Sequence, residues 1–186
     1  MVKPTWRDYE AKSDELIIEL DPGMAFGTGT HPTTSLCAIM IEKYIKKGDH
    51  FLDVGTGSGI LMIAAAKLGA GTVCGVDNDD VAVTVAENNL LANHIDSYRL
   101  STGNLVDDVR QTFNMVAANI LAEVILVLLP DVKAVLKENG LFVCSGIIAA
   151  KTEVVVSGLK EKGFAVVEVI EKEGWVAIAA RNAATG

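Results

Sequence analysis

The chain has 186 residues, half of them hydrophobic, and its 24 acidic and 16 basic side chains give a formal net charge of −8. A chain of this length is expected to form one domain that folds without a disulfide, a metal ion or a partner. The acidic surplus, without clustered lysine or arginine, argues against a protein that grips nucleic acid, since that binding depends on clustered cations. It suits a basic protein partner, and equally an enzyme that merely stays soluble.

The cysteines and the apolar runs indicate the compartment. Cys37, Cys74 and Cys144 are widely separated and form no Cys-x-x-Cys pair, which argues against a disulfide scaffold and a zinc site. The first 15 residues carry charges throughout and have no apolar core, so they predict no secretory signal. The longest apolar stretch, residues 115–129, contains two polar residues and is shorter than the roughly 20 that a membrane helix needs. We expect a cytoplasmic protein without membrane contacts.

Residues 1–20 form a polar leader with one strand-like run at 16–20. From residue 51 onward, short β-branched runs alternate with longer segments of helical periodicity, which predicts parallel strands joined by helices. The predicted strands are residues 51–54, 72–77, 98–102, 115–119, 141–145, 164–170 and 175–180. The expected fold class is therefore α/β, with a doubly wound sheet of seven strands.

Helices are predicted between these strands. The first follows Thr33 or Thr34 as its N-cap and has apolar residues at i,i+4 spacing, a face that should pack on the sheet. The later helices are residues 60–68, 79–93, 121–137 and 150–162. Pro130 is expected to break or restart the third of these, and Gly163 to close the last.

The last two strands are separated only by residues 171–174, which is too short for a crossover helix. They should form an antiparallel hairpin at one end of an otherwise parallel sheet. A plain dinucleotide-binding domain has an all-parallel sheet, whereas a mostly parallel sheet with a terminal hairpin resembles the class I, Rossmann-like, S-adenosylmethionine-dependent methyltransferases.

The predicted strand at 51–54 leads directly into Gly55-Thr56-Gly57-Ser58-Gly59, and a helix follows. Strand, glycine turn and helix form a ligand-binding unit, because glycine allows positive φ and lets the backbone approach a ligand closely. The G-x-G-x-G spacing departs from the dinucleotide G-x-G-x-x-G, so a diphosphate at the helix N-terminus is less expected. Gly55 and Gly57 are candidate cofactor-binding residues.

Asp77 ends the next predicted strand, 22 residues beyond Gly55, where a carboxylate can accept hydrogen bonds from both hydroxyls of a ribose. It could instead be a solvated turn acid or a helix cap, but we favour the ribose role. Together with the glycine loop, it indicates a nucleoside-bearing cofactor, and the missing phosphate fingerprint points to S-adenosylmethionine. Asp53, inside the first strand, either holds the glycine turn or contacts the amino group of the cofactor.

Asn119 stands at the carboxyl end of the predicted strand 115–119, next to the strand that carries the glycine loop. Its amide can hold an amine nucleophile through the N–H of that amine while the nitrogen lone pair stays free to attack. The alternative role is a helix N-cap, which would also face the crevice. We take Asn119 as the candidate catalytic residue.

Residues 21–34 form a loop dense in glycine and threonine before the first helix. This loop either covers a bound cofactor, which its aromatic and methyl groups favour, or is a mere surface connection. His31, which precedes a proline in this loop, is interpreted as a turn or capping residue and is given no proton-transfer role.

Five motifs stand in order along the chain: DPGMAFGTGTHPTT, LDVGTGSGIL, GVDND, ANILA and KEGW. Together they resemble the bacterial PrmA family, which methylates a large-subunit ribosomal protein at the stalk base, and the resemblance covers about residues 20–181. It implies S-adenosylmethionine as the cofactor, bound at Thr34, Gly55, Asp77 and Asn119, of which Thr34 rests on the resemblance alone. It also implies N-methylation of lysine side chains and of an N-terminal amine on that ribosomal protein.

The PrmA family has a separate amino-terminal recognition domain before a linker, and this chain begins at about that linker. We expect residues 1–20 to be a leader or linker and residues 21–186 to be the S-adenosylmethionine-dependent methyltransferase domain. The chain is then either an excised catalytic domain or a short homologue with another substrate. Asn119 is followed by Ile-Leu-Ala instead of the Pro-Pro-aromatic of glutamine or nucleobase methyltransferases, which favours an aliphatic amine acceptor.

Other functions compete with this hypothesis. A nicotinamide-dependent oxidoreductase would use the acidic ribose residue, but the glycine spacing and the terminal hairpin oppose it. A module that holds the cofactor without catalysis and a methyltransferase for another small amine or protein are the remaining alternatives. The preferred hypothesis has a large-subunit ribosomal protein as partner, with no direct nucleic-acid contact.

Overall fold

The computed structural model describes residues 1–4, 6–9, 15–21, 29 and 31–183. Its centre is a seven-stranded sheet with the order β5-β4-β3-β6-β7-β9-β8. The strands are β3 (His50–Val54), β4 (Thr72–Asp77), β5 (Tyr98–Thr102), β6 (Phe113–Asn119), β7 (Leu136–Ile148), β8 (Phe164–Lys172) and β9 (Trp175–Asn182). Strands β3 to β7 are parallel and β9 is antiparallel to both neighbours, which confirms the predicted mostly parallel sheet with a terminal hairpin.

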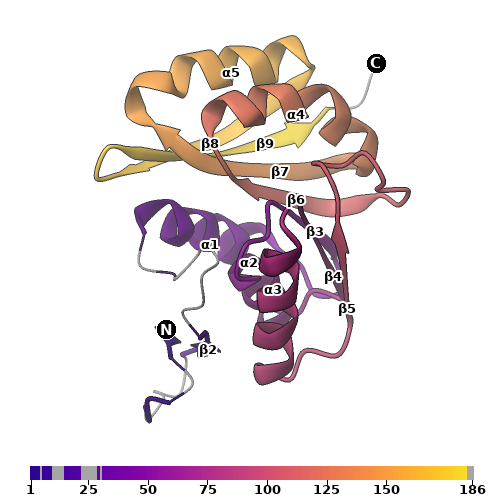
Figure 1. Cartoon of the computed structure of the whole chain (residues 1–186). Helices are drawn as coiled ribbons and strands as arrows, with labels where there is room; N and C mark the ends of the chain where they lie inside the picture. Colours follow the sequence, from indigo (N-terminus) through magenta and orange to yellow (C-terminus); the bar gives the residue numbers. More distant parts are fainter. Residues whose placement is uncertain (5, 10–14, 22–28, 30, 184–186) are drawn as a thin grey trace.

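Helices cover both faces of this sheet. They are α1 (Pro32–Tyr44), α2 (Ile60–Lys67), α3 (Asp80–Ala92), α4 (Ala122–Val135), the short 3-10 helix η1 (Ala149–Lys151) and α5 (Thr152–Glu161). Figure 1 shows α1, α2 and α3 on one face and α4 and α5 on the other. Successive side chains of β3 pack on opposite faces of the sheet. Phe51 belongs to the core beside α1, and Leu52 belongs to the core beside α4. Burial on both faces explains the nearly continuous apolar strands.

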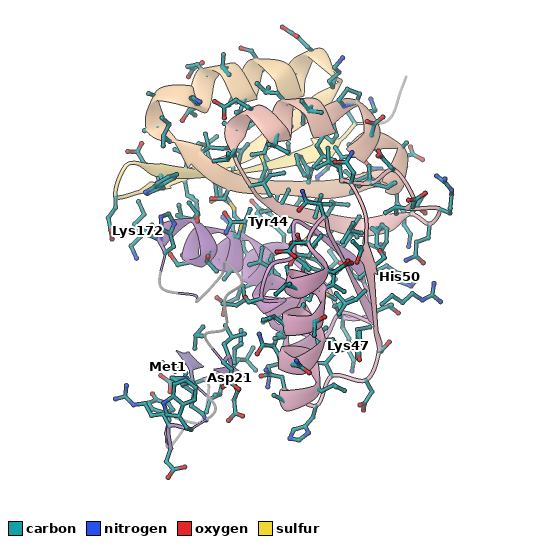
Figure 2. All side chains as sticks on the ribbon, viewed as in Figure 1. Met1, Asp21, Tyr44, Lys47, His50 and Lys172 are labelled. Carbon is teal, nitrogen blue, oxygen red and sulfur yellow. The ribbon has the colours of Figure 1, made fainter. Side chains whose placement is uncertain are left out.

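Helix α1 begins one residue after His31, whose side chain accepts a hydrogen bond from the Thr33 amide. The prediction that Thr33 or Thr34 is the N-cap is therefore wrong: both lie buried in the first turn, which a proline begins. At the other end of the helix, the Tyr44 hydroxyl donates to Glu168 Oε2 at 2.7 Å and ties α1 to β8. Figure 2 labels Tyr44 where α1 meets the sheet.

Helix α4 continues through Pro130, so the prediction of a break or restart there is wrong. A proline in a helix interior costs about 3 kcal/mol, because it removes one backbone hydrogen bond and crowds the preceding turn. Leu128, Leu129 and Val132 surround it in sequence and are at most 1% exposed. Burial of each such side chain contributes about 1.5–3 kcal/mol, so the packing of α4 outweighs the cost of the proline.

The other predicted elements agree with the structure to within two residues at each end, apart from β7 and the start of α1. Strand β7 runs from Leu136 to Ile148, where residues 141–145 were expected. Its early part pairs with β6 through Phe113, and its last residue pairs with Trp175 of β9. The polar run at 137–140 contains Glu, Asn and Gly and resembles a turn. For this reason the sequence did not predict that β7 begins before residue 141.

The hairpin between β8 and β9 turns on two residues. Glu173 and Gly174 have φ values of 55° and 77°, as a type I′ turn requires. The amide of Ala149 donates to the Gly174 carbonyl at 2.9 Å, which fixes the hairpin tip beside the end of β7. Figure 2 labels Lys172, the last residue of β8, at this tip next to α1.

The leader contains two short strands where one was predicted, and β1 (Val2–Lys3) pairs in parallel with β2 (Ile18–Glu19). It is attached to Asn93, the C-cap of α3, because the Asn93 side chain donates to the Glu19 carbonyl at 2.6 Å and accepts from the Glu19 amide at 3.0 Å. Within the described parts of the chain, no helix is long and apolar enough to cross a membrane.

Candidate functional site

A cavity of about 580 Å³ lies at the carboxyl ends of the parallel strands, where open α/β sheets bind their ligands. Its wall comes from the ends of β3 to β6, from a residue near the end of β7 and from the residues that begin α1, α4 and β9. The lining residues are His31, Thr33, Val54, Gly55, Val76, Asp77, Asn78, Gly103, Asn104, Leu105, Asn119, Ile120, Leu121, Val124, Gly146 and Trp175.

The glycine loop after β3 is fixed by hydrogen bonds to β4. The amides of Gly55 and Thr56 both donate to the Val76 carbonyl, at 2.8 and 3.1 Å. Gly55 has a φ of 73°, and a Cβ at this position would lie 2.6 Å from Ile120 Cγ2. Both its conformation and its close neighbour therefore require glycine, and the loop presents bare backbone to the cavity.

The Asp77 carboxylate lines the cavity and is oriented by two backbone amides. The Gly57 amide donates to Oδ2 at 2.8 Å, and the Asp79 amide donates to Oδ1 at 3.1 Å. The N-cap of α3 is Asp79, which accepts a hydrogen bond from the Val81 amide, so Asp77 does not have the capping role. Each carboxylate oxygen has a second lone pair with which to accept a ligand hydroxyl.

Asn119 ends β6 and also lines the cavity. Its Nδ2 donates to Thr34 Oγ1 at 3.3 Å, and Thr34 is only 2% exposed in the first turn of α1. The N-cap of α4 is Leu121, so the alternative that Asn119 caps this helix is wrong. The contact with Thr34 determines which way the amide group of Asn119 points.

Asp53 is a buried carboxylate behind the glycine loop and is 1% exposed. The Thr56 hydroxyl donates to its Oδ2 at 2.9 Å, so Asp53 holds the glycine turn. Its Oδ1 is buried and has no hydrogen-bond partner among the described residues. Burial raises the pKa of Asp53 to about 7; the hydrogen bond from Thr56 opposes this shift and the nearby Asp77 adds to it. The carboxyl therefore titrates close to neutral pH.

His31 and Trp175 form an aromatic pair in the cavity wall. Their ring centroids are 4.8 Å apart and the ring planes meet at 71°, an edge-to-face arrangement. The Thr33 amide donates to Nδ1 of His31 at 3.3 Å, which confirms the interpretation of this histidine as a capping residue.

The structure brings three predicted site residues, Gly55, Asp77 and Asn119, to one cavity. Gly57 and Thr34 do not line it, but each is one hydrogen bond behind it, on Asp77 and Asn119 respectively. Of the predicted cofactor-binding residues, three thus line the cavity and two hold lining side chains in place from behind.

Sequence reasoning missed other lining residues. Residues 103–105 follow the predicted strand 98–102, so the rule that ligands bind at carboxyl ends of strands would have found them. Trp175 stands at the amino-terminal end of its strand and gave no such signal. The loop 21–34 was predicted to cover a bound cofactor. Most of this loop, residues 22–28 and 30, lies outside the described residues, so this stays a prediction.

Comparisons with known proteins agree with this architecture. The family described as Ribosomal protein L11 methyltransferase (PrmA) matches residues 1–183. A ribosomal protein L11 methyltransferase of Desulfosudis oleivorans is 52% identical over 98% of this chain and 62% of the relative. One from Bacillus cereus is 50% identical over 98% of this chain and 59% of the relative. The chain thus spans about three fifths of the length of these curated relatives.

Solved structures show the same fold. The ribosomal protein L11 methylase of Lactobacillus delbrueckii subsp. bulgaricus has a TM-score of 0.92 and 39% identity, covering 96% of this chain and 92% of that chain. The precorrin-6y C5,15-methyltransferase of Geobacter metallireducens has a TM-score of 0.71 and 16% identity, covering 85% and 92% respectively, and shares the fold alone. The predicted methyltransferase fold is confirmed, and the chain belongs to the PrmA family of ribosomal protein L11 methyltransferases.

Proposed function

We propose that this chain transfers methyl groups from S-adenosylmethionine to lysine side chains and to an N-terminal amine of ribosomal protein L11. The proposal depends above all on one observation, which is that Gly55, Asp77 and Asn119 converge on one cavity at the carboxyl ends of the strands. The substrate is taken from the names of the relatives that share 52% and 50% identity.

The residues of the cavity fit the nucleoside part of S-adenosylmethionine. Asp77 offers the ribose hydroxyls a carboxylate that the Gly57 and Asp79 amides hold in place. At Gly55 no side chain separates the backbone from the cavity, so a ligand can approach the main chain closely. When bound, S-adenosylmethionine supplies an electrophilic methyl group on a sulfonium centre.

We assign Asn119 to both the cofactor and the acceptor nitrogen. Its Nδ2 donates to Thr34, which leaves the amide oxygen to accept an N–H of the amine while the nitrogen lone pair attacks. A lysine of pKa near 10.4 loses its proton at pH 7 at a cost of about 4.6 kcal/mol. Desolvation and the neighbouring sulfonium charge lower this cost, so the reaction needs no dedicated side-chain base.

We further propose residues 1–20 as a leader and residues 21–186 as the methyltransferase domain of a cytoplasmic protein. The hydrogen bonds of Asn93 with Glu19 support a leader that is attached at the carboxyl end of α3. The acidic surplus of the chain, with a net charge of −8, supports a basic protein as the partner.

Calorimetric titration with S-adenosylmethionine and with NAD tests the cofactor. We expect saturable binding of S-adenosylmethionine and no binding of NAD, and the reverse result would favour the oxidoreductase. Methyl transfer to L11, measured with and without an added recognition domain from a longer relative, tests catalysis. Cofactor binding without transfer under both conditions would favour the binding module instead.

A further inference from the structure

Trp175 lines the cavity but has no part in the function proposed above. It begins β9, whereas Asp77 ends β4, and the strand order places β3, β6 and β7 between them. Four strand spacings of about 4.8 Å separate the two strands by about 19 Å. Asn119, on β6, lies midway in this order. Trp175 therefore lies at the opposite end of the cavity from the residue assigned to the ribose, with Asn119 between them.

The position of Trp175 is fixed on three sides. Its ring meets the His31 ring edge to face at 4.8 Å, and its backbone pairs with Ile148 of β7. The residue before it, Gly174, accepts a hydrogen bond from the Ala149 amide. Trp175 is thus held by the N-cap residue of α1 and by strand pairing with β7. A side chain on such regular elements is suited to position a ligand accurately.

The surroundings of Trp175 suit an alkyl chain that carries a positive charge. An indole ring packs against methylene groups and attracts a cation within about 6 Å of its face. Two apolar side chains that follow Asn119 or pair with Trp175 are exposed to solvent, Leu121 by 66% and Ile148 by 42%. Leu121 lines the cavity and Ile148 is the strand partner of Trp175.

We propose that Trp175, braced by His31, is the wall of the acceptor channel and positions the alkyl chain of a primary amine so that its nitrogen reaches Asn119. The inference rests on the proposed function and adds to it the residue that guides the acceptor amine to Asn119. The indole holds the ammonium form on arrival and excludes water, and Asn119 orients the nitrogen once the proton has left. Trp175 is then a positioning residue for the acceptor and not a cofactor ligand.

Steady-state kinetics with L11 and calorimetry with S-adenosylhomocysteine test this role. Trp175→Leu keeps an apolar side chain but removes the aromatic ring, and we expect it to raise the KM for L11 about tenfold or more. The Kd for S-adenosylhomocysteine should stay within about twofold of the native value. Trp175→Phe keeps an aromatic face and should recover most of the loss. Weaker S-adenosylhomocysteine binding with an unchanged KM for L11 would place Trp175 in the cofactor site and overturn the proposal.

A binding measurement separates this proposal from the methylation of L11. The chain has two tryptophans, and Trp6 is 70% exposed, so Trp6→Phe leaves Trp175 as the one tryptophan reporter. We expect n-butylammonium chloride, added to this variant with S-adenosylhomocysteine present, to change the emission saturably. Sodium chloride at equal ionic strength and n-butylammonium added to the Trp175→Phe variant should not do so. Equal responses to both salts would overturn the acceptor channel even if L11 is methylated, and a saturable response would support it even if L11 is not.

Discussion

The Asn119 amide donates a hydrogen bond to the Thr34 hydroxyl across 3.3 Å and joins the end of β6 to the first turn of α1. Asn119 lines the cavity, whereas Thr34 is buried behind it. We therefore propose that Thr34 acts on the site through the orientation of the Asn119 amide. The resemblance to the PrmA family implies that both residues bind the cofactor, whereas in the structure only Asn119 lines the cavity.

Removing the Asn119 side chain should slow methyl transfer much more than removing the Thr34 hydroxyl that accepts its hydrogen bond. Asn119→Ala takes away the group to which we assign the orientation of the acceptor nitrogen, and we expect turnover to fall by about a hundredfold or more. Thr34→Val keeps the shape of the side chain but loses one hydrogen bond of about 1 kcal/mol, so turnover should fall about fivefold. Methyl transfer to L11 at saturating cofactor measures both. An unchanged rate in Asn119→Ala would contradict the positioning role.

Asp77→Asn should weaken cofactor binding about tenfold to a hundredfold. Hydrogen bonds to a charged group contribute about 1.5–3 kcal/mol, and the amide replaces one of the two acceptor oxygens with a donor. Calorimetry with S-adenosylhomocysteine measures the Kd. The matched control is Asp79→Asn, which changes the neighbouring acid but keeps a good N-cap for α3. Equal losses in the two variants would mean that Asp77 acts only through the local negative charge.

The alternation of apolar runs along the chain was enough to predict the sheet, since the central strands β3, β4 and β6 are buried on both faces. The sheet edge with Gly55, Asp77 and Asn119 could also be predicted, because parallel strands bring their carboxyl ends together. Pro130 and the length of β7 could not, because in both places tertiary packing outweighs a local signal for a break or turn.

The place of Trp175 in the cavity could not be predicted from the sequence either. It follows from β9 lying between β7 and β8, so that the start of β9 meets His31 at the beginning of α1. The sequence predicts the hairpin but not which of its two strands pairs with β7. The same limit applies to Thr34, whose contact with Asn119 spans 85 positions of the chain.

The stability of the protein should depend on pH through Asp53. Burial raises the pKa of Asp53 from 3.8 to about 7, so the folded chain keeps this proton after the unfolded chain has lost it. The free energy of unfolding should therefore fall as the pH rises from about 4 to about 7, by at most about 4 kcal/mol. Denaturant unfolding at several pH values measures this.

Asp53→Asn is the control for that measurement. The amide oxygen can still accept the hydrogen bond from Thr56, and the side chain no longer ionises. We expect the difference in stability between the variant and the native chain to grow in favour of the variant over this pH range. Parallel pH profiles for the two proteins would show that Asp53 does not keep its proton in the fold.

Gly55→Ala and Gly48→Ala should differ in their effect on stability. Both glycines have positive φ, at 73° and 85°, so both substitutions cost about 1 kcal/mol in backbone strain. A Cβ at Gly55 would also lie 2.6 Å from Ile120 Cγ2, whereas a Cβ at Gly48 would have no atom within 4 Å. Chemical denaturation should show Gly55→Ala to be less stable by a further 1–3 kcal/mol or so. Equal losses would mean that the glycine loop is free to move away from Ile120.

We propose that this chain methylates amines on ribosomal protein L11. The most direct test is to incubate L11 with the chain and S-adenosylmethionine and to measure the mass of L11 by mass spectrometry. We predict that L11 gains the mass of one or more methyl groups on lysine or amino-terminal nitrogen, and that the Asn119→Ala variant does not produce this gain. An unchanged L11 mass, with the cofactor site saturated and a recognition domain supplied, would contradict the claim.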